Sequence, residues 1–536
     1  MHLSAVFSKR IQRFASNQQL FCFFPNSSLS YQDLYRQSTH ILIGLRNVLK
    51  LRPQDRIAFQ CPKSPSWAPF LLACFRNNNI VIPLPMNSPF LNHTLQLTQP
   101  KCIVRQDTLD QLLRFPHDPA LSDIASDPPV FDADSPVFML MTSGSSSLPK
   151  AVVLSHSNIY HNLRQLEIRF SSSSIDFHRS DLSYSFLPWY HCYGLVGELL
   201  FTLWKGTSIY LSGETDPVRN LQKMVFARPT VVQWVPQILY GVERLLDKRA
   251  LFFSWQTPSM KRILLFGNRL RFITLGGAPC LSRSIQSFQM NFDRPLFQGY
   301  GCTEMSPMIS LNTHGRSFDS VGTCLPRIQH RLDPRTQELQ VHGPNRMLGY
   351  LDCILPDESL RYTHSFLNTT TTTRTEANSG VSASVKDERG TEELEFYATG
   401  DRASVNSDGE LKILGRIQDQ YKMANGRFVD PNRLETLLEK HPSIHTAFLF
   451  SPTGGVYNQV LVYSAQFPHS VSAASLLSDI RQICRDHHIH SSLWPRQIQF
   501  LRSPFSTEAQ TLSLKLEKRR IFIQDCYHAG TLDLFP

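Results

Sequence analysis

The feature that most constrains this chain is a repeated unit in which a short apolar strand runs directly into a loop of small and polar residues. Such units occur in VFMLMTSGSSSLPK, VVQWVP, RFITLGG and PLFQGYG. Helical patterns separate other short apolar strands, such as RIAFQ and NIVIPLP on either side of WAPFLLACFRN. This alternation predicts a layered α/β fold with largely parallel sheets, and in such folds ligands bind where the strands end.

Two changes of pattern indicate the domain organisation. Residues 368–393 are rich in Thr, Ser and charged residues and bury little apolar surface, which predicts a solvated, disordered insertion. A second boundary is expected near Gly415, after which helices and strands alternate again. We therefore predict a large N-terminal domain over residues 1–415 and a small C-terminal domain over residues 416–536.

Charge and cysteine content restrict the class of protein. The net charge of +10 favours an acidic partner, but the basic residues are dispersed, so no nucleic-acid-binding arm is predicted. The eleven cysteines have no zinc-site spacing, and no segment is apolar enough for a signal peptide or a membrane-spanning helix. These observations predict a cytoplasmic protein, and they leave open a peripheral membrane contact through Lys9, Arg10 and Arg13.

The first strand-end loop carries the residue types that bind phosphate. Its hydroxyls, backbone amides and single lysine can donate to phosphate oxygens, although its spacing differs from GxxxxGK[ST]. An ordinary serine-rich surface loop has the same composition, so the loop alone does not decide. Its candidate residues are Thr142, Ser143, Gly144, Ser145, Ser146 and Lys150.

Four other segments supply further candidates. FLPWYHCYGL places His191 among aromatic residues, where it is either a core histidine or part of a site. In RFITLGGAPC, the glycine pair that ends with Gly277 allows a flat ligand to approach the backbone. QGYGCTEMSP combines an aromatic ring and a hydroxyl with Glu304, a carboxylate suited to Mg²⁺. YATGD ends in Asp401, an acceptor suited to ribose hydroxyls.

In this order, the segments resemble the adenylate-forming superfamily, which comprises acyl-CoA synthetases, luciferases and the adenylation domains of peptide synthetases. The motifs TSGTTGxPKG, YGxTE, YxTGD and GRxKDxxKxxNG of that superfamily appear here as TSGSSSLPKA, YGCTE, YATGD and GRIQDQYKMANG. The motifs are most similar to those of long-chain fatty acyl-CoA synthetases and acyl-acyl-carrier-protein synthetases. The likeness covers nearly the whole chain, and it implies the two-domain fold of that superfamily.

The resemblance implies a role for each candidate. The loop residues named above would bind the ATP phosphates. Gly277, Ala278 and Tyr300 would line the adenine, while Asp401 and Arg416 would bind the ribose. Two further residues complete the set, because Thr303 would reach the α-phosphate and Glu304 would hold Mg²⁺. His191 is placed in the active site by its motif.

The late catalytic lysine of the superfamily best matches Lys515, and Lys518 is the weaker candidate because the usual proline and glycine markers are missing. Three positions depart from the superfamily pattern: Ser147 and Ala151 stand where glycines are usual, and Gln418 stands where the hinge residue is usually Asp or Lys. The first two raise the question of whether a backbone position that needs positive φ has been lost.

The implied function is an ATP-dependent ligase that adenylates a fatty acid and transfers the acyl group to the thiol of CoA or acyl carrier protein. The HCYGL segment lacks the aspartate that pairs an amino-acid ammonium, which favours an apolar acyl substrate. Two alternatives stay open. One is a degenerate relative that binds nucleotide or acyl chain without turnover, and the other is the acyl-activating half of a phospholipid reacylation pathway.

Overall fold

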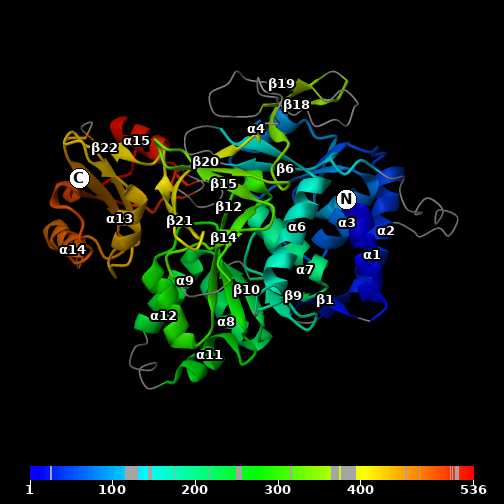
Figure 1. The fold of residues 1–536 in the computed structure, drawn as a ribbon, viewed down its shortest axis with the longest axis horizontal. Helices are drawn as coiled ribbons and strands as arrows, with labels where there is room; N and C mark the ends of the chain where they lie inside the picture. Colours follow the sequence, from blue (N-terminus) through cyan, green and yellow to red (C-terminus); the bar gives the residue numbers. More distant parts are fainter. Residues whose placement is uncertain are drawn as a thin grey trace.

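A computed structural model of the chain resolves the predicted alternation into two large sheets, a smaller four-stranded sheet and a separate C-terminal sheet (Figure 1). The structure describes residues 1–17, 19–24, 27–114, 131–142, 148–173, 175–214, 217–248, 256–313, 317–355, 357–363, 373–375, 394–452, 455–469, 471–506, 509, 511–512 and 518–535.

The first large sheet has the strand order β14-β13-β12-β11-β10-β8-β9-β1-β2 within the described residues. Its strands are β1 (Leu20–Phe24), β2 (Ser27–Ser30), β8 (Leu182–Tyr184), β9 (Ser208–Tyr210), β10 (Val231–Trp234), β11 (Phe272–Leu275), β12 (Leu296–Gly301), β13 (Met308–Leu311) and β14 (Thr323–Cys324). Its centre is parallel: β10 pairs with β8 and β11, and β11 pairs with β12. The carboxyl ends of β10, β11 and β12 therefore meet at one edge.

The second large sheet has the order β19-β18-β17-β7-β6-β4-β3-β5. Its strands are β3 (Arg56–Phe59), β4 (Ile80–Pro83), β5 (Cys102–Val104), β6 (Pro136–Thr142), β7 (Lys150–Ser155), β17 (Gly349–Ile354), β18 (Leu360–Thr363) and β19 (Thr373–Thr375). The predicted insertion at 368–393 lies outside the described residues except for β19, which pairs with β18 and so was not expected.

This sheet is mixed, where the sequence predicted largely parallel pairing. The strands β5, β3, β4 and β6 are parallel, but β7, β17, β18 and β19 pair antiparallel. For β6 and β7 the reason is local, because the connection from Thr142 to Lys150 is too short for a crossover and closes a hairpin instead.

Three smaller sheets follow. The four-stranded sheet is β15 (Gln329–Leu332), β16 (Glu338–His342), β20 (Tyr397–Val405) and β21 (Leu411–Arg416). Next come the pair β22 (Tyr421–Lys422) and β23 (Phe428–Val429), and then the sheet of β24 (Thr446–Phe450), β25 (Asn458–Tyr463) and β26 (Pro495–Leu501). We call the described part of residues 417–535 the C-terminal unit; the domain boundary at 415/416 stays a prediction.

Helices cover the sheets. In the N-terminal body they are α1 (Leu3–Ala15), α2 (Tyr31–Asn47), α3 (Trp67–Asn77), α4 (Leu91–Thr98), α5 (Gln106–Arg114), α6 (His156–Ser171), α7 (Phe201–Lys205), α8 (Pro217–Ala227), α9 (Pro236–Lys248), α11 (Pro258–Phe266) and α12 (Ser282–Phe292), with the π-helix η2 (Tyr193–Leu200) and the 3₁₀ turn η3 (Thr303–Met305). The C-terminal unit contributes α13 (Pro431–Leu438), α14 (Ala473–Asp486), η4 (Ser491–Leu493) and α15 (Arg520–His528). No helix among the described residues combines the length and apolarity needed to cross a bilayer.

Local sequence explains where two covering helices begin. Ser30 and Asp33 form a reciprocal capping box at the start of α2, and Ser155 and Asn158 do the same at α6. The apolar helix α3 is buried along its whole length, as its sequence predicts. The main core runs continuously through both large sheets, so the strand ends that carry the candidate residues are fixed by one packed interior.

Candidate active site

The phosphate-loop candidate is the tip of the β6–β7 hairpin. Thr142 pairs with Lys150 across the hairpin, and the Thr142 hydroxyl donates to the Lys150 carbonyl at 3.5 Å. The Pro149 carbonyl accepts a hydrogen bond from His93 Nε2 of α4 at 3.0 Å. Four predicted phosphate ligands, Ser143, Gly144, Ser145 and Ser146, lie outside the described residues together with Ser147.

Lys150 and Glu304 are linked through Tyr350, a residue that belongs to none of the motifs in the sequence. The Lys150 ammonium lies 5.0 Å from the centre of the Tyr350 ring, and the Tyr350 hydroxyl donates to Glu304 Oε1 at 2.8 Å. Burial and the Glu304 carboxylate raise the pKa of Tyr350, so its hydroxyl stays a donor. Only the pairing of β17 with β7 brings Tyr350 here, and no spacing in the sequence shows it.

Glu304 has the surroundings of a single-carboxylate Mg²⁺ ligand. It is 9% exposed in the turn η3, whose first residue, Thr303, is also buried. Tyr350 holds Oε1, while no described residue hydrogen-bonds Oε2. The described residues contain no group of three or more His, Cys, Asp and Glu suited to a metal. A carboxylate with one free oxygen fits Mg²⁺ that completes its coordination with phosphates and water.

The predicted adenine and ribose residues form a second contact chain. The Tyr300 hydroxyl at the end of β12 donates to Asp401 Oδ2 at 2.7 Å, and Arg416 Nε lies 3.7 Å from Asp401 Oδ1. Asp401 and Arg416 are opposite each other in the β20–β21 ladder. Burial and the neighbouring carboxylate raise the pKa of Tyr300, which keeps this hydroxyl protonated. The pair Asp401 and Arg416 thus lies next to the aromatic ring expected against adenine.

The glycine turn after β11 lies beside the same strand. Gly277 has φ +84°, a conformation that favours glycine, and Ala278 follows it. A Cβ at Gly276 would come within 3.5 Å of the Gly299 carbonyl in β12 and of the Tyr193 ring. The turn therefore sits between Tyr193 and the strand that ends in Tyr300.

His191 shares a small cavity with the base of the phosphate loop. The cavity has a volume of about 10 Å³, and its walls include Phe90, Met141, Pro149 and Tyr190. The structure thus brings His191 to the phosphate-loop hairpin, although the 40 residues 151–190, which include α6 and β8, lie between Lys150 and His191 in the sequence. The motif FLPWYHCYGL identifies His191 as a candidate, whereas its distance along the sequence from the phosphate loop does not.

The lysine candidates differ in what the structure records for them. Lys515 lies outside the described residues. The Lys518 ammonium is held by Glu435 at 3.0 Å and by Glu439 at 2.7 Å. Burial opposes its charge, yet these two carboxylates raise the pKa of Lys518, which makes it a structural cation of the C-terminal unit. The neighbouring Arg519 guanidinium lies 5.3 Å from the ring of Phe90, at the His191 cavity.

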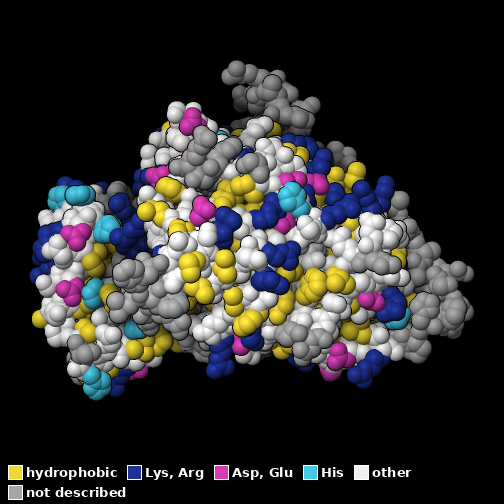
Figure 2. Space-filling model, turned by 90° about the horizontal axis from the view of Figure 1, so that it is seen from below, with side chains coloured by type: hydrophobic (Ala, Val, Ile, Leu, Met, Phe, Trp, Pro, Cys, Tyr) yellow, Lys and Arg dark blue, Asp and Glu magenta, His cyan; other side chains and the backbone are white. Residues whose placement is uncertain are grey.

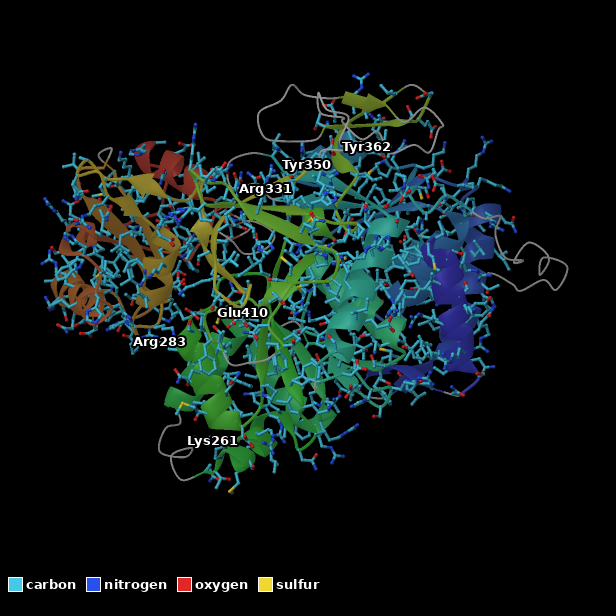
Figure 3. The ribbon with its side chains drawn as sticks, viewed as in Figure 1. Lys261, Arg283, Arg331, Tyr350, Tyr362 and Glu410 are labelled. Carbon is cyan, nitrogen blue, oxygen red and sulfur yellow. The ribbon has the colours of Figure 1, made fainter. Side chains whose placement is uncertain are left out.

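Two departures from the superfamily pattern can be assessed. Ala151 is buried in β7 opposite Met141 and has no positive φ, so no glycine is needed there. At the predicted hinge, Ile417 N donates to the Gly400 carbonyl at 2.9 Å, and Gln418 follows. Figure 3 shows Tyr350 near the top of the body and Arg283 at the border with the C-terminal unit.

Comparisons with known proteins agree on one family. The sequence profile described as "AMP-binding enzyme" matches residues 7–351. A feruloyl-CoA synthase of Amycolatopsis sp. is 23% identical over 522 residues, with 92% of this chain and 94% of the relative covered. A peroxisomal long chain acyl-CoA synthetase 6 of Arabidopsis thaliana is 25% identical over 402 residues, which cover 66% of this chain and 51% of the relative. The crystal structure of ATP-bound MatB from Rhodopseudomonas palustris superposes with a TM-score of 0.71 at 21% identity, covering 98% and 99% of the two chains.

Proposed function

Because the chain belongs to the AMP-binding enzyme family, we propose that it joins a carboxylic acid to a thiol at the expense of ATP, through an acyl-adenylate. The observation that carries this proposal is a pair of contact chains, Lys150–Tyr350–Glu304 and Tyr300–Asp401–Arg416, which are linked because Tyr300 and Glu304 belong to one short segment. One chain offers a cation and a carboxylate for phosphates and Mg²⁺, and the other offers groups for a ribose.

The reaction has two steps. A carboxylate oxygen of the acid attacks the α-phosphorus of ATP, the bond to the bridging oxygen of pyrophosphate breaks, and acyl-adenylate remains. The thiol sulfur then attacks the acyl carbon, and AMP leaves with the electron pair of the broken C–O bond. Negative charge grows at the phosphates in the first step, which is where fixed positive charge lowers the barrier. Mg²⁺ held by Glu304 supplies part of that charge when bound.

Residue roles follow from this scheme. Lys150 and the hairpin tip would neutralise the leaving pyrophosphate, and Thr303 would contact the α-phosphate. His191 would face the acid, because it lies beside the phosphate-loop base. Lys515 would stabilise the transition state of the first step, since Lys518 is bound by two carboxylates.

A fatty acid is the proposed substrate. The absence of an aspartate in HCYGL supports an apolar acid over an amino acid, and a long-chain acyl-CoA synthetase is among the relatives. An aromatic acid is the competing substrate, because a feruloyl-CoA synthase is another relative. A matched panel of fatty and aromatic acids separates the two.

Either CoA or an acyl carrier protein would supply the thiol. The net charge of +10 favours an acceptor that carries phosphates or acidic side chains. In the face shown in Figure 2, Lys and Arg side chains are spread widely and outnumber Asp and Glu. A carrier-linked product would also suit the acyl-activating half of a phospholipid reacylation pathway.

A second proposal concerns the opposite end of the N-terminal body, at α1 (Figure 1). A cavity of about 500 Å³ there is lined by cations that include Lys9, Arg10 and Arg13. Arg10 is committed to the fold, because it lies 3.5 Å from Glu167 and stacks on Trp204 at 3.9 Å. Lys9 and Arg13 would make the peripheral contact with an anionic membrane, which sedimentation with anionic and with neutral vesicles tests.

The test of the ligase function is acid-dependent exchange of pyrophosphate into ATP. We expect the wild type to exchange with fatty acids of some chain length, and Glu304→Ala to lose at least about 100-fold of that rate. Glu410→Ala is the control, because Glu410 lies in the turn between β20 and β21, away from Tyr350 (Figure 3). Exchange by no acid, from folded protein that still binds ATP, would replace the ligase with the binding-only relative.

A further inference from the structure

A buried carboxylate lies behind the loop that carries His191. Glu198 is 0% exposed in the π-helix η2. Its oxygens accept hydrogen bonds from Trp189 Nε1 at 2.8 Å, from the Ser185 hydroxyl, and from Leu187 N at 3.5 Å. All three donors belong to residues 185–189, directly before His191. The carboxylate therefore ties this loop to the helix that follows it.

A lysine from the other large sheet holds the same loop. Lys63 follows β3. The residue as a whole is exposed to solvent, but its ammonium group points into the protein. The Nζ atom donates to the Ser185 carbonyl at 3.1 Å, the Ser185 hydroxyl at 3.2 Å and the Leu187 carbonyl at 3.2 Å. The Ser185 hydroxyl thus accepts from Lys63 while it donates to Glu198, so the three groups form one network.

The charges of this network depend on each other. Burial lowers the pKa of Lys63, and the Glu198 carboxylate partly offsets that effect. Burial raises the pKa of Glu198, and Lys63 and the hydrogen bonds oppose the shift. A buried charge pair adds little net stability compared with apolar residues of the same size. The pair does fix one geometry of the loop, because Glu198 and Lys63 are both buried charges that need all of their hydrogen-bond partners in place.

The loop and the helix η2 that this network holds contact two parts of the candidate site. The first part is His191. His191 N donates to the Pro188 carbonyl at 3.2 Å, and the His191 carbonyl accepts from Leu195 N of η2 at 2.8 Å. Gly194 packs so closely that a Cβ there would lie 2.3 Å from the Pro188 carbonyl oxygen. A displacement of the loop against η2 would therefore move His191.

The second part is the glycine turn. Tyr193 is the first residue of η2; its ring lies against Gly276 and Gly277, and its hydroxyl is 3.3 Å from Thr274 Oγ1. π-Helices concentrate at functional sites, where their widened turns re-aim side chains. In this one, Glu198 is anchored to the loop and Tyr193 supports the turn expected to contact adenine.

We propose that Glu198 and Lys63 are positioning residues for adenylation: through Ser185 they fix the His191 loop and η2, and so align His191 with the Gly276–Gly277 turn. The proposal rests on the proposed ligase function and adds two residues to it that contact neither ATP nor the acid. A rate loss is expected from such a remote change, because a shift of about 1 Å at reacting groups costs on the order of 100-fold.

The test compares Glu198→Gln with Asp181→Asn. Asp181 is a matched control, because it is buried, is paired with Arg271 at 2.6 Å, and directly precedes β8, whereas Ser185 of the network directly follows that strand. We expect Glu198→Gln to lower kcat of pyrophosphate exchange by roughly 10- to 100-fold with little change in the KM for ATP. Asp181→Asn should lower the melting temperature similarly and leave kcat unchanged. Lys63→Met should resemble Glu198→Gln, and Lys63→Arg should restore part of the rate.

Equal kcat losses in Glu198→Gln and Asp181→Asn would overturn the proposal, as would full activity of Glu198→Gln. If the wild type exchanges with no acid, the ligase function fails separately. In that case, NMR of protein with ¹⁵N-labelled histidine tests the alignment of His191 directly. The His191 resonances are identified as those that disappear in His191→Ala. The His191 resonances must move in Glu198→Gln and stay in place in Asp181→Asn, and the reverse result rejects the positioning role.

Discussion

At the scale of single residues, Tyr350 is the contact that joins two predicted ligands. Its ring faces Lys150, and its hydroxyl holds Glu304. Tyr350→Phe keeps the ring and removes only the hydroxyl, which leaves Glu304 without its donor. We expect kcat/KM for ATP in pyrophosphate exchange to fall by about tenfold, which corresponds to the loss of a hydrogen bond to a charged group. Titration of Mg²⁺ at fixed ATP should show a raised requirement for the metal.

The control for Tyr350→Phe lies one strand away. Tyr362 of β18 is buried, whereas Tyr350 is half-buried, and it pairs opposite Leu351 rather than facing Glu304. Tyr362→Phe should leave the Mg²⁺ requirement unchanged. A Tyr350→Phe variant with wild-type Mg²⁺ dependence would show that the hydroxyl does not position Glu304.

At the scale of elements, α1 is docked on α3 and α6 through two imidazoles. The rings of His2 and His156 are 3.6 Å apart, and both donate from Nε2 to Asn78 Oδ1, at 3.2 and 3.1 Å. Burial lowers the pKa of both imidazoles below the ordinary value of 6.5, so both are neutral in the folded state near neutral pH. Unfolding lets them take up protons. The folded state is therefore at its full stability with respect to these two groups above pH 6.5, and it loses stability as the pH falls below that value.

We expect the free energy of unfolding to fall by up to about 1.4 kcal/mol per pH unit for each imidazole in that acidic range. Urea denaturation at about pH 7.5 and about pH 5.5 measures the difference. His156→Gln should reduce this pH dependence, whereas the same change at the exposed His178 should leave it as in the wild type. An undiminished dependence in His156→Gln would assign the acid sensitivity to other groups.

At the scale of the whole molecule, side chains of the C-terminal unit contact the body at several places. Lys440 Nζ lies 2.6 Å from Ser284 Oγ, Arg283 is 2.9 Å from His487 Nε2, and Arg519 stacks on Phe90. If the second step needs the unit to rotate about the hinge, then fixing the backbone at Gln418 should impair it. We expect Gln418→Pro to slow thioester formation by at least roughly tenfold and to change pyrophosphate exchange far less, because proline fixes φ without touching the site.

Gln418→Ala removes the same side chain but leaves the backbone free, so it serves as the control for the hinge. Rapid-quench measurement of thioester from preformed adenylate separates transfer from adenylation. Equal slowing of both steps by Gln418→Pro would mean that the two steps use one arrangement of the C-terminal unit.

Local pattern was enough for much of the fold. The strands β3, β4, β6, β10, β11 and β12 and the helix α3 lie where their apolar patterns predicted them. The mixed second sheet was not predictable in this way, because β17 and β18 join it from residues about 200 positions later than β7. Strand pairing over such separations depends on the packing of the whole sheet rather than on local preference.

The same division holds for the site. The motifs specify which chemical groups are present: Lys150, Tyr300, Glu304, Asp401 and Arg416 each stand in a short motif whose residue types are those expected to bind phosphate, adenine, Mg²⁺ or ribose. How these groups are joined follows from the packing of the folded chain. Tyr350, Lys63 and Glu198 have no motif, and they matter through contacts between strands and loops that are distant in sequence. The physical reason is that a motif records what a ligand must touch, whereas the support behind it is set by packing and by the need of buried polar groups for partners.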